Sequence, residues 1–360
     1  MPQSDFLNAC RGLPVARVPV WFMRQAGRSQ PEYRAIRRRR TFLEIVRDPA
    51  LAAEITALPV QQLGVDAAIL FSDIMVPLGP AGIDYTLEEH VGPVIAAPVR
   101  TRADVAALRD VEPRRDLPYV LETVARAREA LGPTPLIGFA GAPFTLASYL
   151  VEGRPSRAHV ATKTMMHAAT PLFDDLLARL GAVVTAYLRA QAEAGAQALM
   201  LFDSWAGTLS PADYERHVLP VMRAIVSATA DLQVPRIVFG VETGELLTRM
   251  RDSGAEVVGV DWRVPLGVAS ARLGPTVAIQ GNLDPALLLA PWEAVESAAS
   301  DALKAGTRHR GGYVFNLGHG VLPDTPQETL RRLVERVHAE PPPAALESAG
   351  GASPTLPARR

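Results

Sequence analysis

Cysteine is almost absent from this sequence. Its 360 residues include one cysteine, Cys10, so no disulfide can form within the chain. A site built from several cysteines, such as a zinc or iron–sulfur site, is excluded as well, and a single thiol fits a reducing compartment. The first eight residues contain no apolar segment of the signal-peptide type. We therefore expect a cytoplasmic protein.

Net charge is nearly absent too. The chain holds 37 Lys and Arg against 38 Asp and Glu, which gives a formal charge of -1. Without a basic excess there is no electrostatic attraction to nucleic acid or to an anionic membrane, so neither is expected as a partner. The longest uncharged run, residues 130 to 151, is interrupted by three glycines and three prolines. It predicts a loop, a strand, a turn and a helix start, not a membrane span.

The sequence also lacks the short motifs of several large enzyme classes. It contains no G-x-G-x-x-G or G-x-x-x-x-G-K-[ST] segment for nucleotides, no G-x-S-x-G nucleophile elbow and no H-E-x-x-H zinc motif. The histidines other than His319 have no partners at metal-ligand spacing. We therefore expect neither a metal nor an organic cofactor.

A repeat of short apolar segments is present instead, and each segment is followed by a helical pattern. The eight segments cover residues 18–23, 65–71, 135–140, 197–202, 236–240, 256–260, 276–280 and 312–316. Eight β-α units predict a (β/α)8 barrel, a TIM barrel, in the α/β class. An open doubly wound sheet is the alternative, and it is disfavoured because the glycine-rich fingerprint is missing.

The domain prediction is a single barrel over residues 1–338. Residues 75–100 carry an alternating pattern between prolines and glycines, which predicts an inserted hairpin. Residues 339–360 are rich in Pro and Ala with few large apolar side chains, so they predict a disordered tail.

Polar residues follow the predicted strands, where barrels of this class carry their chemistry. The first segment runs into Arg24 and Arg28, two planar guanidiniums that flank Gly27 and suit carboxylates or phosphates. Residues 24–40 contain seven arginines and one acidic residue, which predicts an acidic ligand. A solvated surface is the other interpretation, and we favour it for Arg38 to Arg40. His319 lies between two glycines, so its imidazole has room to face a ligand.

Six motifs, in order along residues 17–338, resemble the uroporphyrinogen decarboxylase family. They are Met23-Arg24-Gln25-Ala26-Gly27-Arg28, Ile69-Leu70-Phe71-Ser72-Asp73, Gly138-Phe139-Ala140-Gly141-Ala142-Pro143-Phe144-Thr145, Tyr149-Leu150-Val151-Glu152-Gly153, Gln280-Gly281-Asn282-Leu283-Asp284-Pro285 and Asn316-Leu317-Gly318-His319-Gly320. One departure is visible: Ser29-Gln30-Pro31 follows the second arginine, where the family usually has Tyr-Leu-Pro.

The resemblance implies a homodimeric (β/α)8 carboxy-lyase of haem and tetrapyrrole biosynthesis. Such an enzyme needs no cofactor and converts the four acetate side chains of uroporphyrinogen III to methyl groups, giving coproporphyrinogen III. Asp73 and Arg24 are the implied catalytic residues. The implied substrate-binding residues are Arg24, Gln25, Ala26, Gly27, Arg28, Arg37, Asp73, Phe139, Tyr149, Phe202, Ser204 and His319.

The implied reaction needs an electron sink, and the substrate can supply one. A pyrrole protonated on a ring carbon becomes a cation that accepts the electrons left by carbon dioxide. A fixed carboxylate near the pyrrole nitrogens would stabilise that cation, and Asp73 suits this role. We expect Arg24 and Arg28 to hold Asp73 ionised. The proton donor stays open between a substrate carboxyl, a water and an arginine.

Two other functions compete with this one. Zinc-dependent corrinoid methyltransferases share the barrel, but they need a thiolate-bearing metal site that one cysteine does not provide. A non-catalytic porphyrinogen-binding protein would need the arginines but would have no use for Asp73.

Overall fold

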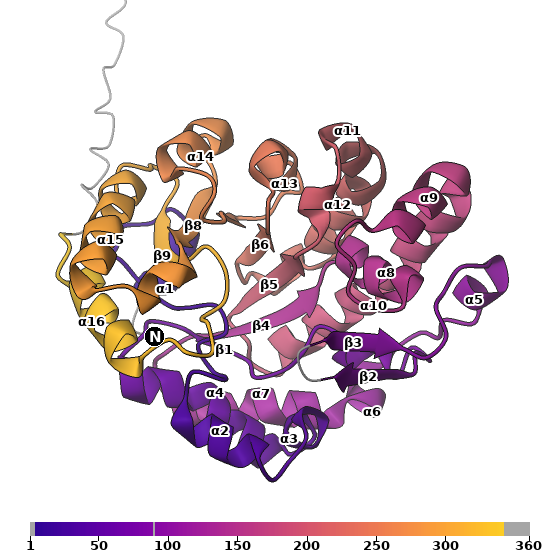
Figure 1. Ribbon diagram of the computed structural model, residues 1–360, viewed down its shortest axis with the longest axis horizontal. Coiled ribbons are helices and arrows are strands. Elements are labelled where there is room, and N and C mark those ends of the chain that lie inside the picture. Colours follow the sequence, from indigo (N-terminus) through magenta and orange to yellow (C-terminus); the bar gives the residue numbers. More distant parts are fainter. Residues whose placement is uncertain (1–3, 89–90, 342–360) are drawn as a thin grey trace, which may run out of the picture.

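The computed structural model describes residues 4–88 and 91–341 of the chain. Seven parallel strands form one curled sheet, and helices surround it on the outside (Figure 1). The strands, in spatial order, are β1 (Ala68–Ile69), β4 (Leu136–Gly141), β5 (Ala198–Asp203), β6 (Arg236–Gly240), β7 (Val257–Gly259), β8 (Ala278–Leu283) and β9 (Tyr313–Leu317). Spatial order equals chain order, as the repeated β-α units predicted.

A short extended segment closes the ring in place of a full eighth strand. Val20 forms a parallel bridge with Phe315 of β9. The Phe315 N–H donates to the Pro19 carbonyl at 2.9 Å, and the Trp21 N–H donates to the Phe315 carbonyl at 3.3 Å. On the other side the Asp66 N–H donates to the Val20 carbonyl at 2.8 Å. The barrel prediction is confirmed, with a first strand shorter than the expected residues 18–23.

Side chains explain why this first strand is short. The Phe22 N–H donates to Oε1 of Gln25 at 2.9 Å, and the Met23 N–H donates to Oδ1 of Asn316 at 3.1 Å. Both N–H groups therefore bond to side chains and not to the backbone of a neighbouring strand, so the ladder ends after Trp21.

The helices that follow the strands cover the outer face of the ring (Figure 1). Their bounds are α4 (Pro49–Leu63), α7 (Pro118–Leu131), α10 (Thr170–Glu193), α12 (Leu219–Ala228), α13 (Leu247–Arg251), α14 (Leu266–Leu273), α15 (Trp292–Gly306) and α16 (Gln327–His338). The remaining α-helices are α1 (Asp5–Cys10), α2 (Pro31–Arg37), α3 (Phe42–Val46), α5 (Arg102–Ala106), α6 (Pro113–Asp116), α8 (Pro143–Glu152), α9 (Val160–Ala168) and α11 (Pro211–Asp213). Helix α4 ends at Gly64, whose φ of 73° gives the left-handed C-cap expected of a glycine there.

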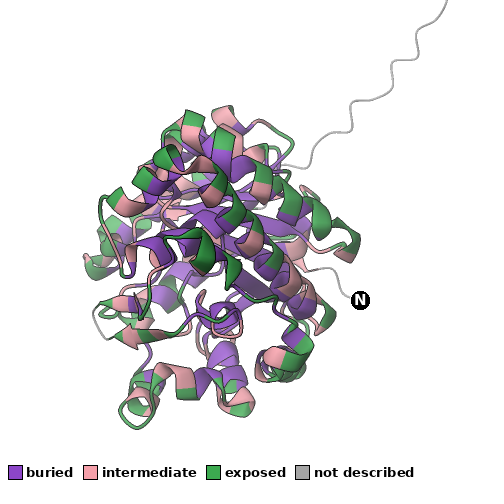
Figure 2. Cartoon of the chain, turned by 90° about the vertical axis from the view of Figure 1, so that its right-hand side faces the viewer, coloured by how far each residue is buried: buried purple, intermediate pink, exposed green. Residues whose placement is uncertain are grey.

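Burial is concentrated in the sheet, and the exposed positions lie on the outer helices (Figure 2). Every residue of β4, β6 and β9 is buried. Two polar groups inside the ring are paired: Nε1 of Trp21 donates to Oε1 of Gln280 at 2.9 Å, and the Tyr313 hydroxyl donates to the Gly281 carbonyl at 2.8 Å. Burying one large apolar side chain contributes roughly 1.5–3 kcal/mol, so this sheet is a rigid platform for the loops above it.

The predicted insertion is a separate antiparallel hairpin, β2 (Tyr85–Glu88) and β3 (Gly92–Ile95). The Ile95 N–H donates to the Gly153 carbonyl at 2.8 Å, which attaches the hairpin to the end of α8. The tail predicted for residues 339–360 lies outside the described residues from 342 onward. Among the described residues, no helix is both long and apolar enough to cross a bilayer.

Candidate active site

Two buried glutamines hold the loop that carries Arg24 and Arg28. The Gln25 side chain accepts from the Phe22 N–H, and its Nε2 donates to the Ala67 carbonyl at 2.9 Å. Oε1 of Gln30 accepts from the Gly27 N–H at 3.2 Å. Gln25 is therefore a brace beneath the loop, and its side chain does not face a ligand. Gln30 shows how the Ser29-Gln30 departure is accommodated, because its amide packs inward and supports Gly27.

Arg24 has an unusual backbone conformation. Its φ is 59°, in the left-handed region that few non-glycine residues adopt. Its side-chain stem crosses Gly320, where an added Cβ would overlap the Cδ of Arg24. The Val321 N–H also donates to the Met23 carbonyl at 2.8 Å, which ties the two loops together. Such strain costs about 1–3 kcal/mol and is typical of residues whose orientation matters for function.

Asp73 follows β1 and is half-buried. Its Oδ1 accepts from the Met75 N–H at 2.8 Å, an Asx turn that fixes the carboxylate. Oδ2 forms no hydrogen bond with another described residue. Burial raises the pKa of Asp73, whereas the Met75 N–H and the Arg24 guanidinium lower it by less. The expected effect of Arg24 is therefore present, but burial outweighs it and the net shift of the Asp73 pKa is upward.

His319 follows β9 and is a neutral donor. Its Nδ1 accepts from the Gly320 N–H at 2.6 Å, which assigns the ring proton to Nε2. Burial, then Arg24 and Arg263, lowers the pKa of His319 to about 4. At neutral pH the imidazole therefore offers an uncharged N–H group to a ligand.

Tyr149 on α8 lies in the same electrostatic environment. Its ring packs edge-on against Trp205, with 5.9 Å between the ring centroids. Burial raises the pKa of Tyr149, a hydrogen bond with the Trp205 side chain lowers it, and the charges of Asp73 and Arg24 have smaller, opposite effects. The hydroxyl therefore stays protonated at neutral pH. Arg24 thus acts on Asp73, Tyr149 and His319, which the sequence separates by almost the whole barrel.

A row of aromatic rings lies beside these polar groups. Ring centroids are 5.4 Å apart for Phe139 and Phe202, 6.2 Å for Phe202 and Phe239, and 6.4 Å for Phe239 and His319. The row crosses from β4 to β5 to β6 and ends at the imidazole. It can pack against a large flat ligand, while the cations and donors bind its charged edges.

Comparison with known proteins identifies this arrangement. The family model described as uroporphyrinogen decarboxylase matches residues 1–340. The chain belongs to the uroporphyrinogen decarboxylase family. It is 58% identical over 337 residues to the uroporphyrinogen decarboxylase of Streptomyces coelicolor, covering 94% of each chain. It is 56% identical to that of Streptomyces griseus, covering 94% of this chain and 92% of the relative.

A solved structure supports the fold of this uroporphyrinogen decarboxylase family member. A methyltransferase from Methanosarcina mazei superimposes with a TM-score of 0.78, covering 92% of this chain and 97% of its own. Its sequence identity is 22%, so the likeness concerns the barrel alone.

Several residues implied by the family resemblance have no described contact with Asp73. Nη1 of Arg37 donates to the Arg40 carbonyl at 2.6 Å, at the end of α2. Arg28 is exposed, and within the described residues its side chain makes no contact with Asp73. Ala26 and Ser204 are half-buried. No hydrogen bond or ion pair among the described residues joins these side chains to Asp73.

Three aromatic residues of the site are not among the substrate-binding residues that the family resemblance implies. Phe239 pairs with Phe202 across the β5–β6 register, so the alternation of β6 could have indicated it. Trp205 and Trp262 both follow strands and contact predicted members, Tyr149 and His319 respectively. Their position directly after an apolar segment was the available signal.

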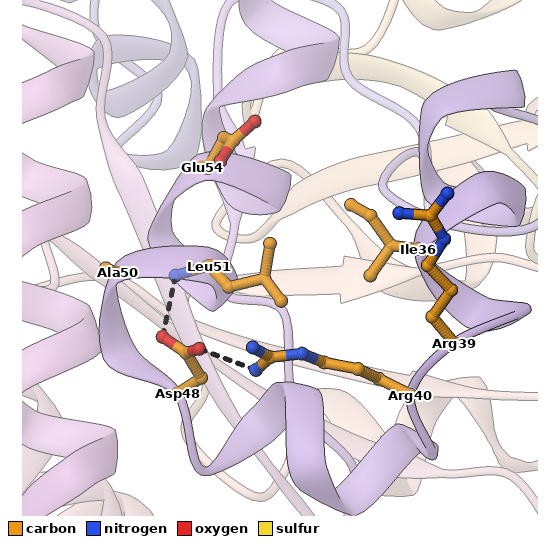
Figure 3. A pocket seen from close by; sticks show the side chains of 7 residues that line it. All are labelled: Ile36, Arg39, Arg40, Asp48, Ala50, Leu51 and Glu54. Atoms are coloured by element: carbon orange, nitrogen blue, oxygen red, sulfur yellow. Dashed lines mark hydrogen bonds and ion pairs between the residues drawn. The ribbon is translucent and has the colours of Figure 1, made fainter.

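A recess of about 400 Å³ lies beside the arginine-rich stretch (Figure 3). It is lined by Ile36, Arg39, Arg40, Asp48, Ala50, Leu51 and Glu54. Nη1 of Arg40 pairs with Oδ2 of Asp48 at 2.7 Å, and Oδ1 of Asp48 accepts from the Leu51 N–H. The recess therefore has carboxylates beside its cations, and no predicted site residue lines it. We assign the active site to the strand ends.

Proposed function

We propose that this chain removes the four acetate carboxyls of uroporphyrinogen III and yields coproporphyrinogen III. Each step replaces a carboxylate by a proton: R–CH2–COO⁻ and H⁺ give R–CH3 and CO2. Family membership supports this carboxy-lyase reaction in tetrapyrrole biosynthesis. The observation that carries it is the cluster in which Arg24 acts on Asp73, Tyr149 and His319 beside a row of phenylalanines.

Asp73 is the residue that responds to charge formed during the reaction. Its Oδ2 has no hydrogen-bond donor among the described residues, so it can accept from the pyrrole N–H groups. Burial disfavours its negative charge in the free protein. A cation that forms on the pyrrole relieves this penalty, so the interaction strengthens along the reaction path.

The other residues orient the substrate. Arg24 and the exposed Arg28 bind carboxylates by charge-assisted hydrogen bonds. The Nε2–H of His319 and the hydroxyl of Tyr149 are neutral donors for the same groups. The phenylalanine row contacts the tetrapyrrole faces. The substrate itself accepts the electrons, so we propose that the reaction needs no cofactor.

We further propose that the protein is a homodimer in the cytoplasm. The family resemblance supports the dimer, and the single cysteine supports a reducing compartment. Sedimentation velocity at micromolar concentration tests the assembly. A single species at the mass of one chain, 38.6 kDa, would contradict it.

Anaerobic incubation with uroporphyrinogen III tests the function. The products are oxidised and separated by chromatography, which resolves species with eight to four carboxylates. We expect conversion to the tetracarboxylate, and we expect activity to survive dialysis against a chelator. Binding without any loss of carboxylates would favour the non-catalytic binding protein. Activity that returns only with added metal or coenzyme would contradict cofactor independence.

A further inference from the structure

A third arginine, Arg263, lies at the same rim of the barrel, after β7. Its guanidinium carbon is 4.0 Å from the centroid of the Trp262 ring. The Trp262 ring in turn packs against the imidazole of His319, with 6.3 Å between centroids. The positive charge of Arg263 also lowers the pKa of His319, together with burial and Arg24. Two arginines from distant parts of the chain therefore act on one site residue.

Two carboxylates of different character hold Arg263. Asp261 is fully buried, with a side-chain exposure of 0%, and its Oδ2 lies 3.1 Å from Nη1 of Arg263. Oδ1 of Asp261 accepts from the Arg263 N–H at 3.1 Å, and Oδ2 also accepts from the Glu242 N–H. Asp261 is thus fixed by three donors. It fixes the direction of the arginine.

Glu242 is the second carboxylate, and it is held loosely. Its Oε1 lies 3.0 Å from Nη2 of Arg263, and its side chain is 56% exposed. An ion pair at this exposure contributes about 0–1 kcal/mol, because water screens it and two long side chains lose freedom. Stacking on Trp262 keeps the guanidinium in place without this partner. Glu242 is therefore the partner that another carboxylate can replace.

We propose that Arg263 binds a carboxylate of the tetrapyrrole at the barrel rim, and that Glu242 occupies its guanidinium until the substrate replaces it. The inference rests on the proposed function, since uroporphyrinogen carries more carboxylates than Arg24 and Arg28 can bind. The row of rings from Phe239 through His319 to Trp262 leads to Arg263, so a ligand lying on that row reaches it.

The competing interpretation makes Arg263 a staple between the loops after β6 and β7. Both interpretations use the same ion pairs, but they differ in the sign of one effect. If Arg263 is a staple, loss of either partner loosens the rim and weakens substrate binding. If Glu242 competes with the substrate, its neutralisation strengthens binding.

The test measures KM and kcat for uroporphyrinogen with three variants. We expect Arg263→Gln to raise KM about 5- to 10-fold with kcat nearly unchanged, since one charge-assisted contact at a half-exposed site is lost. Glu242→Gln should lower KM about 2- to 5-fold. In the double variant, Glu242→Gln should no longer lower KM, because the Arg263 guanidinium for which Glu242 competes with the substrate is absent.

Arg272→Gln is the matched control. Arg272 pairs with the neighbouring Glu245 at 3.0 Å and donates to the Gly244 carbonyl, so it is a staple of the same loop. Its KM should equal that of the wild type. Thermal melting of all variants checks that each is folded.

Equilibrium binding of uroporphyrin, which has the same eight carboxylates, separates this inference from the proposed function. We expect the same order of affinities: Glu242→Gln tightest, then wild type, then Arg263→Gln. If the three proteins bind uroporphyrin in this order but the wild type releases no CO2 from uroporphyrinogen, the proposed function is wrong and the inference stands. Unchanged binding in Arg263→Gln, or weaker binding in Glu242→Gln, would overturn the inference.

Discussion

Strands β1 and β5 both end near an aspartate, but the two carboxylates lie in different surroundings. Asp73 is half-buried, has one oxygen without a described partner and lies near Arg24. Asp203 is fully buried, and its Oδ1 accepts from the Thr145 hydroxyl at 2.8 Å. Its Oδ2 also has no described partner, but that oxygen is buried in the protein. Burial raises the pKa of Asp203 to about 7. We propose that the same residue type serves a ligand at one strand end and the scaffold at the other.

The scaffold role of Asp203 can be followed outward. The Thr145 hydroxyl that donates to Asp203 accepts from the Trp205 N–H at 3.2 Å. Trp205 in turn packs on Tyr149. Asp203 is therefore linked to Tyr149 through Thr145 and Trp205. What distinguishes the two aspartates is a neighbouring cation and an open side, and neither depends on the strand that carries them.

The largest effect is expected from a substitution of Asp73, after β1. Asp73→Asn keeps the shape of the side chain and can still accept from a pyrrole N–H, but it removes the charge. We expect kcat to fall on the order of 10²-fold or more with a modest change in KM, because the lost interaction belongs to the transition state. Steady-state kinetics with uroporphyrinogen measures this. Near-normal kcat would remove Asp73 from the mechanism and leave the family assignment in place.

The same substitution at the β5 end should act on stability. The folded pKa of Asp203, about 7, lies above the unfolded value of 3.8, so the folded state binds more protons between these values. The wild type should therefore lose stability as pH rises from about 4 to about 7 and then level off. Asp203→Asn should remove this slope. Between pH 5 and pH 8 the variant should gain on the order of 2–3 kcal/mol relative to the wild type.

Urea unfolding at the two pH values measures that difference. The kcat of Asp203→Asn should fall by less than that of Asp73→Asn, since Asp203 acts only through Thr145. An equal fall in kcat would contradict the proposal that Asp73 acts directly on the substrate and Asp203 only through Thr145. A pH-independent stability difference would show that Asp203 is ionised throughout.

Much of the fold could be predicted from the sequence. The order of the strands, the hairpin and the end of α4 at Gly64 follow from local patterns: apolar runs, turn residues and a glycine that accepts positive φ. The inward direction of Gln25 could not be predicted. It depends on the Ala67 carbonyl, which lies 42 positions away. The direction of the pKa shift of Asp73 could not be predicted either. Burial and the charge of Arg24 act on it in opposite directions, and the sequence indicates only the charge.

A smaller effect compares the two arginines of the loop. Both are exposed, but the stem of Arg24 lies against Gly320. Arg28→Lys keeps the charge but loses the planar fork, and we expect about 1 kcal/mol of binding to be lost, a few-fold rise in KM. Arg24→Lys should cost more. If Arg28→Lys behaves as wild type, Arg28 is a solvated loop residue.

The smallest effect concerns a region that belongs to neither strand end. The composition of residues 342–360 does not support a core. Truncation after Pro341 keeps the pair between Arg336 and Glu340 and should leave kcat and the melting temperature nearly unchanged. A drop of several degrees would show that this segment packs on the barrel or on a second subunit.

The closure of the ring by residues 19–21 also sets when the site can form during translation. Met23 hydrogen bonds to Asn316, 293 positions later in the chain. At about 5–20 residues per second, the arginine loop is synthesised on the order of 15 to 60 s before that partner. Until then Arg24 has neither Gly320 beneath it nor β9 beside it. A ribosome-bound chain that ends before β9 therefore lacks the site, so binding of a polycarboxylate reports that synthesis has passed β9 and the ring has closed.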